Sequence, residues 1–132
     1  MIVVDASAIV AIVRGEPDRR RFIESIRNDG DARLSAVNYV ESAMVCGGAK
    51  GPAGRALFER DLAILQLLGL SVAPADPAQA EGAREAFSRY GRKRHPAALN
   101  LGDCFAYALA KSLAAPLLYK GDDFAKTDIR AA

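Results

Sequence analysis

The 132-residue sequence has no tryptophan, one histidine and two cysteines. With His95 alone, one chain cannot build a metal site from several histidines, and Cys46 and Cys104 form neither a C-x-x-C pair nor a Cys/His cluster of the kind that binds zinc. No apolar run approaches the roughly 20 residues of a membrane helix. The N-terminal segment has an acidic residue at position 5, which is not typical of a signal or transit peptide. These absences predict a reduced, cytoplasmic protein without a membrane segment.

The chain also lacks a large excess of either positive or negative charge. The chain carries 18 Lys and Arg against 16 Asp and Glu, a net charge of +2 at pH 7, which by itself does not indicate a nucleic-acid-binding protein. Hydrophobic residues make up 51% and charged residues 26%, a globular balance that argues against disorder. The length suits one domain, expected over residues 1–132. Function must therefore be sought in where the charges lie.

Short apolar runs alternate with longer helical patterns along the whole chain. Strands are predicted over 2–4, 33–35, 70–73 and 116–119, and helices over 8–13, 18–28, 37–45, 57–68, 78–90 and 104–114. Ser7 is the expected N-cap of the first helix. Glycines between 47 and 54 predict a turn between two helices. This alternation predicts an α/β protein, a three-layer α/β/α fold with a short, mainly parallel sheet of four to five strands.

Acidic side chains follow the predicted strands. Asp5 comes directly after the first strand, and Asp122 and Asp123 follow the last one. Asp103 lies in the first turn of the last helix, and Glu41 lies early in the helix after the second strand. Because the carboxyl ends of parallel strands share one edge of a sheet, these acids are expected to converge there.

Converging carboxylates repel one another and raise one another's pKa unless a cation lies between them. Oxygen ligands without His or Cys suit Mg²⁺ or Mn²⁺, and such an ion activates water and neutralises charge on a phosphodiester. Each acid also has a simpler explanation when taken alone. Asp5 and Asp103 could satisfy amides or the dipole at a helix start, Glu41 could be solvated, and Asp122 and Asp123 could be turn residues. Only their joint placement indicates metal-assisted phosphodiester hydrolysis.

Four segments share a pattern that extends over almost the whole chain, from residue 2 to about 129: VVDASA at 3–8, NYVES at 38–42, LNLGDCFAYALA at 99–110 and LLYKGDDF at 117–124. Together they resemble the PIN-domain ribonuclease toxins of the VapC type, which belong to type II toxin–antitoxin systems. The resemblance implies a small α/β/α endoribonuclease that uses Mg²⁺ or Mn²⁺, acts on tRNA or rRNA, is inhibited by a VapB-like antitoxin and commonly forms a homodimer.

The resemblance also assigns the site. The first three acids of the family match Asp5, Glu41 and Asp103, with Asp5 and Asp103 as the metal ligands. The fourth acid is Asp122 or Asp123, and Asp128 is a third possibility that suits a hydrogen bond in the tail better. Ser7 stands where the family often has threonine and keeps the hydroxyl, so it is expected to contact RNA.

A basic loop precedes the last helix. Its members are expected to bind phosphates of RNA: Arg92, Lys93, Arg94 and His95. Met44, with Val37 and Val40, lies on an apolar stripe that could continue onto a dimer surface.

Three other functions are alternatives from the residues alone. A receiver-like Mg²⁺-binding signalling domain wants an acidic pair after the first strand and an acid after a central strand, whereas Asp5 stands alone and Pro74 follows residues 70–73. A phosphatase of the haloacid dehalogenase type needs an acid where Ser7 stands. A non-catalytic RNA-binding module would bind RNA without metal-dependent cleavage.

Overall fold

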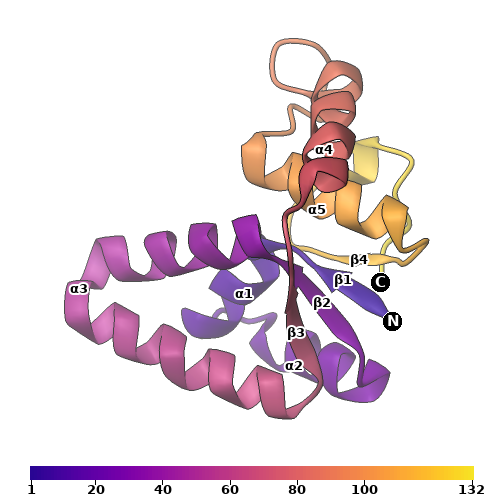
Figure 1. Ribbon diagram of the computed structural model, residues 1–132. Coiled ribbons are helices and arrows are strands. Elements are labelled where there is room, and N and C mark those ends of the chain that lie inside the picture. Colours follow the sequence, from indigo (N-terminus) through magenta and orange to yellow (C-terminus); the bar gives the residue numbers. More distant parts are fainter.

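A computed structural model describes residues 1–132, apart from the side chain of Ala49. Four strands form one sheet in the order β3-β2-β1-β4, and every pairing in it is parallel (Figure 1). The strands are β1 (Ile2–Val4), β2 (Ala32–Ser35), β3 (Leu70–Ala73) and β4 (Leu117–Leu118). The helices are α1 (Ala6–Val13), α2 (Arg19–Asp29), α3 (Ala36–Leu67), α4 (Pro77–Tyr90), α5 (Leu101–Ser112) and the 3-10 helix η1 (Phe124–Lys126).

The sheet separates two hydrophobic cores, because successive side chains of a strand point to opposite faces. Val4 of β1 packs with residues of α1, α2 and α3, whereas its neighbour Val3 packs with residues of α4 and α5. Both valines are fully buried. The predicted three-layer α/β/α architecture is confirmed, with four strands in the sheet. In the described part of the chain, no helix is both long enough and apolar enough to span a membrane.

The strand register fixes which chain segments meet at the carboxyl edge of the sheet. Val4 lies opposite Leu34 of β2 and Leu118 of β4, and the backbone amide of Asp5 donates to the Leu118 carbonyl at 2.9 Å. The start of α1, the start of α3 and the segment after β4 therefore leave the sheet side by side.

The start of α1 corrects one expectation. Ser7 is not the N-cap: Asp5 is, with extended φ and ψ of −81° and 156°, and its side chain accepts a hydrogen bond from the Ser7 amide. The helix begins at Ala6 because Asp5 is the last residue held extended by the sheet. The proline start of α4 is as predicted, with Asp76 as N-cap and Pro77 at the first helical position.

Helix α3 is a hairpin of two arms that run antiparallel (Figure 1). The reversal is sharper than the predicted turn over 47–54, because Gly51 alone has non-helical angles, φ 55° and ψ −131°, and Pro52 follows it. Gly54 lets the arms approach, since a Cβ there would stand 2.1 Å from the Cys46 carbonyl oxygen. The predicted turn between two helices is confirmed, and its tight geometry depends on Gly51 and Gly54.

Candidate active site

Asp5 is the innermost acid at the carboxyl edge of the sheet, and only 3% of it is exposed. Its Oδ2 accepts from the Ser7 amide at 2.9 Å and the Ser7 hydroxyl at 2.6 Å, whereas its Oδ1 is buried without a hydrogen-bond partner. Burial raises the pKa of Asp5, and the hydrogen bonds from Ser7 only partly oppose that effect. One half of this carboxylate is therefore held by the helix start, and the other half is free to bind a ligand.

Ser7 links two chain segments at this edge. Its hydroxyl donates to Asp5 and accepts from the backbone amide of Lys120, at 3.0 Å, just after β4. The Lys120 ammonium pairs instead with Glu16 and Asp18, at 2.6 Å and 3.4 Å. The structure thus places the Ser7 hydroxyl in contacts that orient Asp5 and fix the segment leading to Asp122 and Asp123.

Glu41 reaches the site from the first arm of α3 and lies against the first turn of α5. A Cβ on Gly102 would stand 2.2 Å from Glu41 Oε2, so the glycine makes room for the carboxylate. Asn38, fully buried, donates through Nδ2 to Glu41 Oε2 at 3.2 Å and to the Gly102 carbonyl at 3.0 Å. Burial raises the pKa of Glu41, the Asn38 hydrogen bond lowers it, and the charge of Asp5 raises it further.

Asp103 belongs to the capping box of α5. Its amide donates to Asn100 Oδ1 at 2.9 Å, and its Oδ2 accepts from the Asn100 amide at 3.0 Å. Partial burial is the main cause that raises the pKa of Asp103 to about 7, against the hydrogen bond from Asn100. The charges of Asp5, Glu41 and Asp123 raise it as well. Asp103 therefore caps a helix and at the same time faces three other acids.

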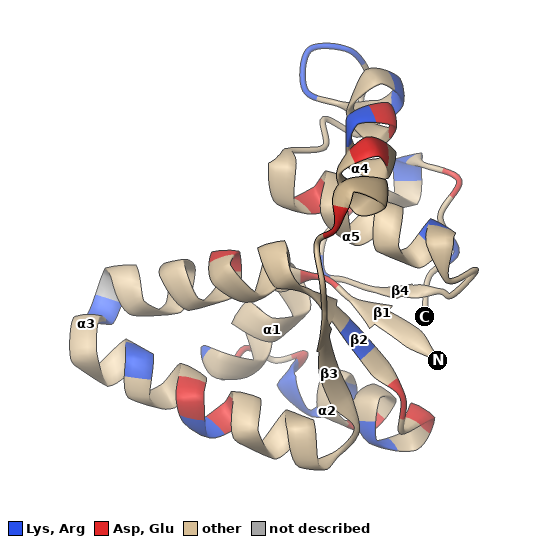
Figure 2. Ribbon diagram, viewed as in Figure 1, with Lys and Arg blue, Asp and Glu red and all other residues tan. Residues whose placement is uncertain are grey.

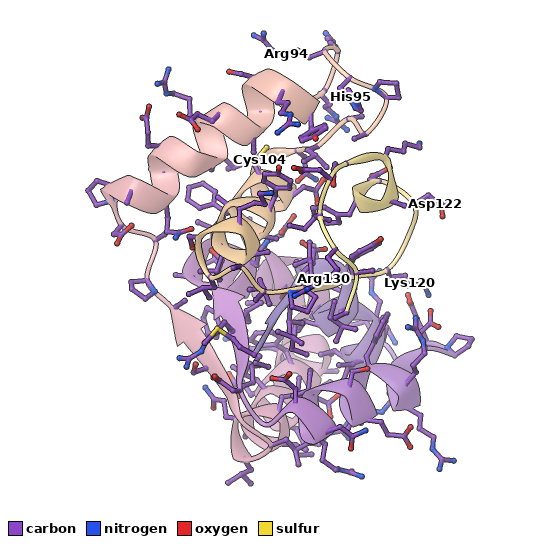
Figure 3. The ribbon with its side chains drawn as sticks, turned by 90° about the vertical axis from the view of Figure 1, so that its right-hand side faces the viewer. Arg94, His95, Cys104, Lys120, Asp122 and Arg130 are labelled. Carbon is purple, nitrogen blue, oxygen red and sulfur yellow. The ribbon has the colours of Figure 1, made fainter. Side chains whose placement is uncertain are left out.

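The three candidates for the fourth acid lie in different surroundings. Asp123 is the one whose charge acts on Asp103. Asp122 and Asp123 are both exposed, and Figure 3 shows the Asp122 side chain at the outer side of the segment after β4. Asp128 accepts from the Tyr107 hydroxyl and pairs with Lys111 at 3.1 Å and Arg89 at 3.7 Å. These contacts lower the pKa of Asp128 and fasten the C-terminal tail to α4 and α5.

Four acids thus form what we call the acidic cluster: Asp5, Glu41, Asp103 and Asp123. Within the described residues, none of the four is paired with a Lys, Arg or His side chain. Nor do three or more His, Cys, Asp or Glu side chains of the described chain gather closely enough to hold one ion between them. The charge of Asp5 raises the pKa of Glu41, and the charges of Asp5, Glu41 and Asp123 raise the pKa of Asp103, but the acids stand wider apart than a single coordination shell.

This arrangement suits a hard divalent cation that keeps part of its water. Mg²⁺ usually takes only one or two protein carboxylates directly and retains several waters. The unpartnered Oδ1 of Asp5 and the uncompensated charge around Asp103 are the features of this chain that such an ion would satisfy.

The basic loop lies directly before α5. Arg92, Lys93 and Arg94 are exposed, and Figure 2 shows the loop as a run of basic residues at the end of α4. A bridge between Gly91 and Leu99 closes the base of the loop, one residue before the α5 N-cap. His95 is turned toward its own loop, because its Nδ1 accepts from the Ala97 amide at 3.0 Å and its ring packs on Tyr90.

Two residues that hold the site were not predicted from the sequence, Asn38 and Gly102. A polar side chain at position 38, between the apolar Val37 and Val40, was the available signal for Asn38. Gly102 stands inside the first turn of a helix, where glycine has low propensity, and that placement could have indicated a close approach.

The chain was also compared with known proteins. Residues 2–130 match the PIN domain family. Ribonuclease VapC42 of Mycobacterium tuberculosis is 43% identical over 132 residues, 99% of this chain and 98% of that protein. Ribonuclease VapC of Mycolicibacterium smegmatis is 43% identical over 131 residues, 98% of each.

The structure of Mycobacterium tuberculosis VapC20, described as a Sarcin-Ricin loop cleaving toxin, superposes with a TM-score of 0.77 at 14% identity. It covers 100% of this chain and 98% of its own, and at that identity it shows the fold alone. By the family match and the two relatives, this chain belongs to the PIN domain family, among the VapC ribonucleases.

Proposed function

We propose that this protein is a metal-dependent endoribonuclease, the toxin of a VapBC-type toxin–antitoxin pair, and that the acidic cluster is its active site. The single observation that carries the proposal is that four acids, one after β1, one in α3, one in α5 and one after β4, lie at one edge of the sheet without a pairing Lys, Arg or His side chain of the described chain. The names of the relatives, all ribonucleases, support the reaction class.

Mg²⁺, or Mn²⁺ in its place, is the proposed ion, with Asp5 and Asp103 as its ligands. A bound ion of this kind supplies a water of lowered pKa and neutralises charge on the phosphodiester. Ser7 holds the Asp5 carboxylate in one orientation, and Asn38 holds that of Glu41. Glu41 and Asp123 complete the negative field that draws the ion in.

RNA is the proposed substrate, tRNA or rRNA, cut within the chain. Arg92, Lys93 and Arg94 are exposed cations near the start of α5 and supply phosphate contacts, together with the free Nε2 side of His95. The related structure carries the description of a toxin that cleaves an rRNA loop, which supports a structured RNA as the target class.

The proposal is tested by incubating the wild type, Asp5→Asn and Asp103→Asn with a panel of tRNAs and rRNA fragments. Cleavage is expected with Mg²⁺ or Mn²⁺ and not with chelator, and each variant should lose about 100-fold or more in rate. Glu59→Gln is the matched control, because Glu59 is an exposed acid on the second arm of α3. Cleavage that survives chelation, or full activity in both cluster variants, would refute the assignment.

A second readout does not depend on activity. Mg²⁺ should raise the melting temperature of the wild type and of Glu59→Gln, because the ion binds only the folded cluster. The same addition should leave Asp5→Asn unchanged. If Mg²⁺ has no effect on the wild type but RNA is still bound, a non-catalytic RNA-binding module is the better description.

The homodimer is proposed from an exposed apolar patch beside the cluster. Its large members are Val40, Met44, Val45 and Leu101, with Met44 69% and Leu101 72% exposed. They line one groove with Glu41, so a second copy seated there would flank the active site.

Light scattering of the wild type and Met44→Glu tests this assignment. A dimer that becomes a monomer in the variant is expected. A wild-type monomer whose VapB-like antitoxin no longer binds Met44→Glu would assign the patch to the antitoxin instead.

A further inference from the structure

A second groove lies between α4 and the first turns of α5, outside the acidic cluster. Ala83 and Phe87 of α4 face Leu101, Cys104 and Phe105 of α5, and Arg94 of the basic loop completes the lining. Figure 3 shows Cys104 between the two helices and Arg94 at the end of α4 where the basic loop begins. Arg94 is also one of the proposed phosphate contacts and Leu101 also belongs to the apolar patch, whereas the proposed reaction does not use the other side chains of the groove.

The aromatic wall of this groove is unusual for the chain. Phe22, Phe58 and Phe124 are buried, whereas Phe87 is 37% exposed and Phe105 is partly exposed. Gly91 lies close to Phe87, because a Cβ there would stand 2.4 Å from the Phe87 carbonyl oxygen and 2.5 Å from the ring atom Cδ2. Position 91 therefore admits only glycine, and the ring remains available on its exposed side.

Arg94 adds a flat cation to the aromatic wall. Its guanidinium carbon lies 5.3 Å from the centroid of the Phe87 ring. Among the described residues Arg94 has no carboxylate partner, and its neighbours Arg92 and Lys93 have none either. Aromatic rings beside unpaired cations fit a flat, polar ring on an anionic strand, which describes an unpaired nucleobase.

The groove and the acidic cluster share the first turn of α5. Leu101, Cys104 and Phe105 line the groove, while Gly102 and Asp103 meet the cluster. The two sites are thus separated by about one helix diameter, roughly 10 Å. A single RNA strand can span that distance within a few nucleotides.

We propose that the groove between α4 and α5 binds one unpaired base of the substrate RNA, stacked on Phe87 and Phe105 with Arg94 beside it. This inference rests on the proposed ribonuclease function. A base-binding groove gives the proposed ribonuclease a preference for single-stranded RNA, because a base inside a duplex cannot enter the groove.

The experiment measures binding with chelator present, so that no RNA is cut. Fluorescence anisotropy compares a 12-nucleotide oligoadenylate with the same strand carrying abasic riboses. A 2-aminopurine probe in the strand reports stacking through its quenching. The variants are Phe87→Leu, Phe105→Leu and, as control, Leu113→Ala, since Leu113 is exposed to the same degree as Phe87 but lies at the far end of α5.

We expect the wild type and Leu113→Ala to bind the base-bearing strand roughly tenfold more tightly than the abasic strand. Phe87→Leu and Phe105→Leu should lose most of that ratio and of the quenching, with abasic binding unchanged. Equal ratios in all four proteins overturn the stacking site. If that result accompanies Mg²⁺-dependent cleavage of the panel RNAs, the proposed ribonuclease function still stands. Absence of both binding and cleavage overturns both.

Discussion

Single carboxylates in this protein serve a helix and the site together. Asp5 gives Oδ2 to the start of α1 and keeps Oδ1 unpartnered, and Asp103 gives Oδ2 to the capping box of α5. Helix capping, the simpler explanation of Asp5 and Asp103, is therefore confirmed for these two acids and does not compete with the proposed metal binding. What distinguishes Asp103 is its pKa of about 7, which capping alone would lower.

Asp122 and Asp123 are adjacent acids with different expected effects. Asp123→Asn should reduce RNA cleavage about tenfold or more, because its charge reaches Asp103 and helps to attract the ion. Asp122→Asn should stay within about twofold of the wild type, since the Asp122 charge is not among those that raise the pKa of Asp103 and its side chain lies on the outer side. Initial cleavage rates at a fixed Mg²⁺ concentration check both, and the reverse order would move the fourth acid to Asp122.

Asn38 is expected to act as a positioning residue for Glu41. Asn38→Ala removes the donor to Glu41 and to the Gly102 carbonyl, so the Mg²⁺ concentration for half-maximal cleavage should rise about 10- to 100-fold. Ser42→Ala is the matched control, because Ser42 is equally buried and its hydroxyl donates to the Asn38 carbonyl and not to the Glu41 carboxylate.

Both variants should lose stability by about 1–3 kcal/mol in urea unfolding. A parallel rise of the Mg²⁺ requirement in both would mean that Asn38 acts only through the fold.

At the scale of elements, local patterns determined most of the fold. Strands over 2–4 and 70–73 have the predicted bounds, because each is a short apolar run that an acid or a proline ends. The contact between α3 and α5 was harder to predict from the sequence. Glu41 lies against Gly102, and Asn38 donates to the Gly102 carbonyl across 64 residues, so the local signals at Asn38 and Gly102 do not say which segments meet. The choice between Asp122 and Asp123 depends on how the chain turns into η1 after Gly121.

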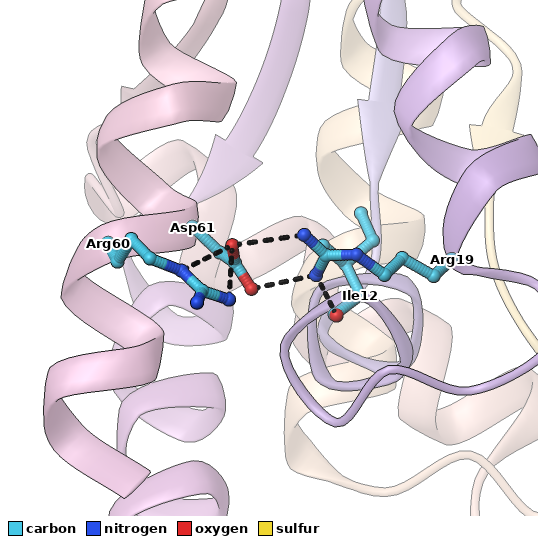
Figure 4. Close-up of polar contacts among 4 residues, drawn as sticks. All are labelled: Ile12, Arg19, Arg60 and Asp61. Carbon is cyan, nitrogen blue, oxygen red and sulfur yellow. Dashed lines mark hydrogen bonds and ion pairs between the residues drawn. The ribbon is translucent and has the colours of Figure 1, made fainter. Parts of the chain in front are cut away.

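A buried carboxylate ties three helices together far from the acidic cluster (Figure 4). Asp61, 1% exposed on the second arm of α3, accepts from Arg19 at 2.8 Å and 3.2 Å and from Arg60 at 3.1 Å. Arg19 also donates to the Ile12 carbonyl, at the end of α1. The hairpin of α3 is thereby held against α1 and α2.

Asp61→Asn should therefore lower the free energy of unfolding by about 3 kcal/mol, because it removes the charge that pairs with Arg19 at a position only 1% exposed. Urea unfolding measures the change, and Glu24→Gln serves as control. Glu24 pairs with Arg20 on the exposed face of α2, so its loss should cost less than about 1 kcal/mol. Equal effects of the two variants would contradict a structural role for Asp61.

At the scale of the whole molecule, both cores share one sheet. Val3 and Val4 of β1 belong to opposite cores, so neither core can lose its packing without disturbing β1. We infer one domain over residues 1–132, and urea unfolding followed by fluorescence and circular dichroism should give one coincident transition. Two separate unfolding midpoints would instead indicate that the cores on the two faces of the sheet unfold independently.

The molecule is nearly neutral overall, but its acidic and basic residues lie in separate places. The acidic cluster gathers four carboxyl groups at the carboxyl edge of the sheet, while Arg92, Lys93 and Arg94 stand exposed on the loop before α5 (Figure 2). The net charge of +2 therefore understates the attraction of this end of the molecule for a polyanion once a cation occupies the cluster.

The cluster also sets how stability depends on pH in the absence of metal. Asp103 titrates near pH 4 when unfolded and about 7 when folded, so between these values the unfolded chain releases its proton first. The free energy of unfolding should therefore fall as the pH rises from about 4 to about 7. The carboxyl is partly exposed, which reduces the effect, and we expect about 2 kcal/mol. The raised pKa values of Asp5 and Glu41 act in the same direction.

Asp103→Asn should flatten this slope and make the chelated protein more stable than the wild type at pH 8, because it removes one of the charges that repel. Urea unfolding at pH 5 and pH 8, with chelator and again with Mg²⁺, measures it. Mg²⁺ should restore most of the wild-type stability at pH 8 and little of it at pH 5, where protonated acids bind the ion poorly. If Asp103→Asn follows the wild type at both pH values, the acids do not repel one another, and the electrostatic basis for a metal in the cluster is removed.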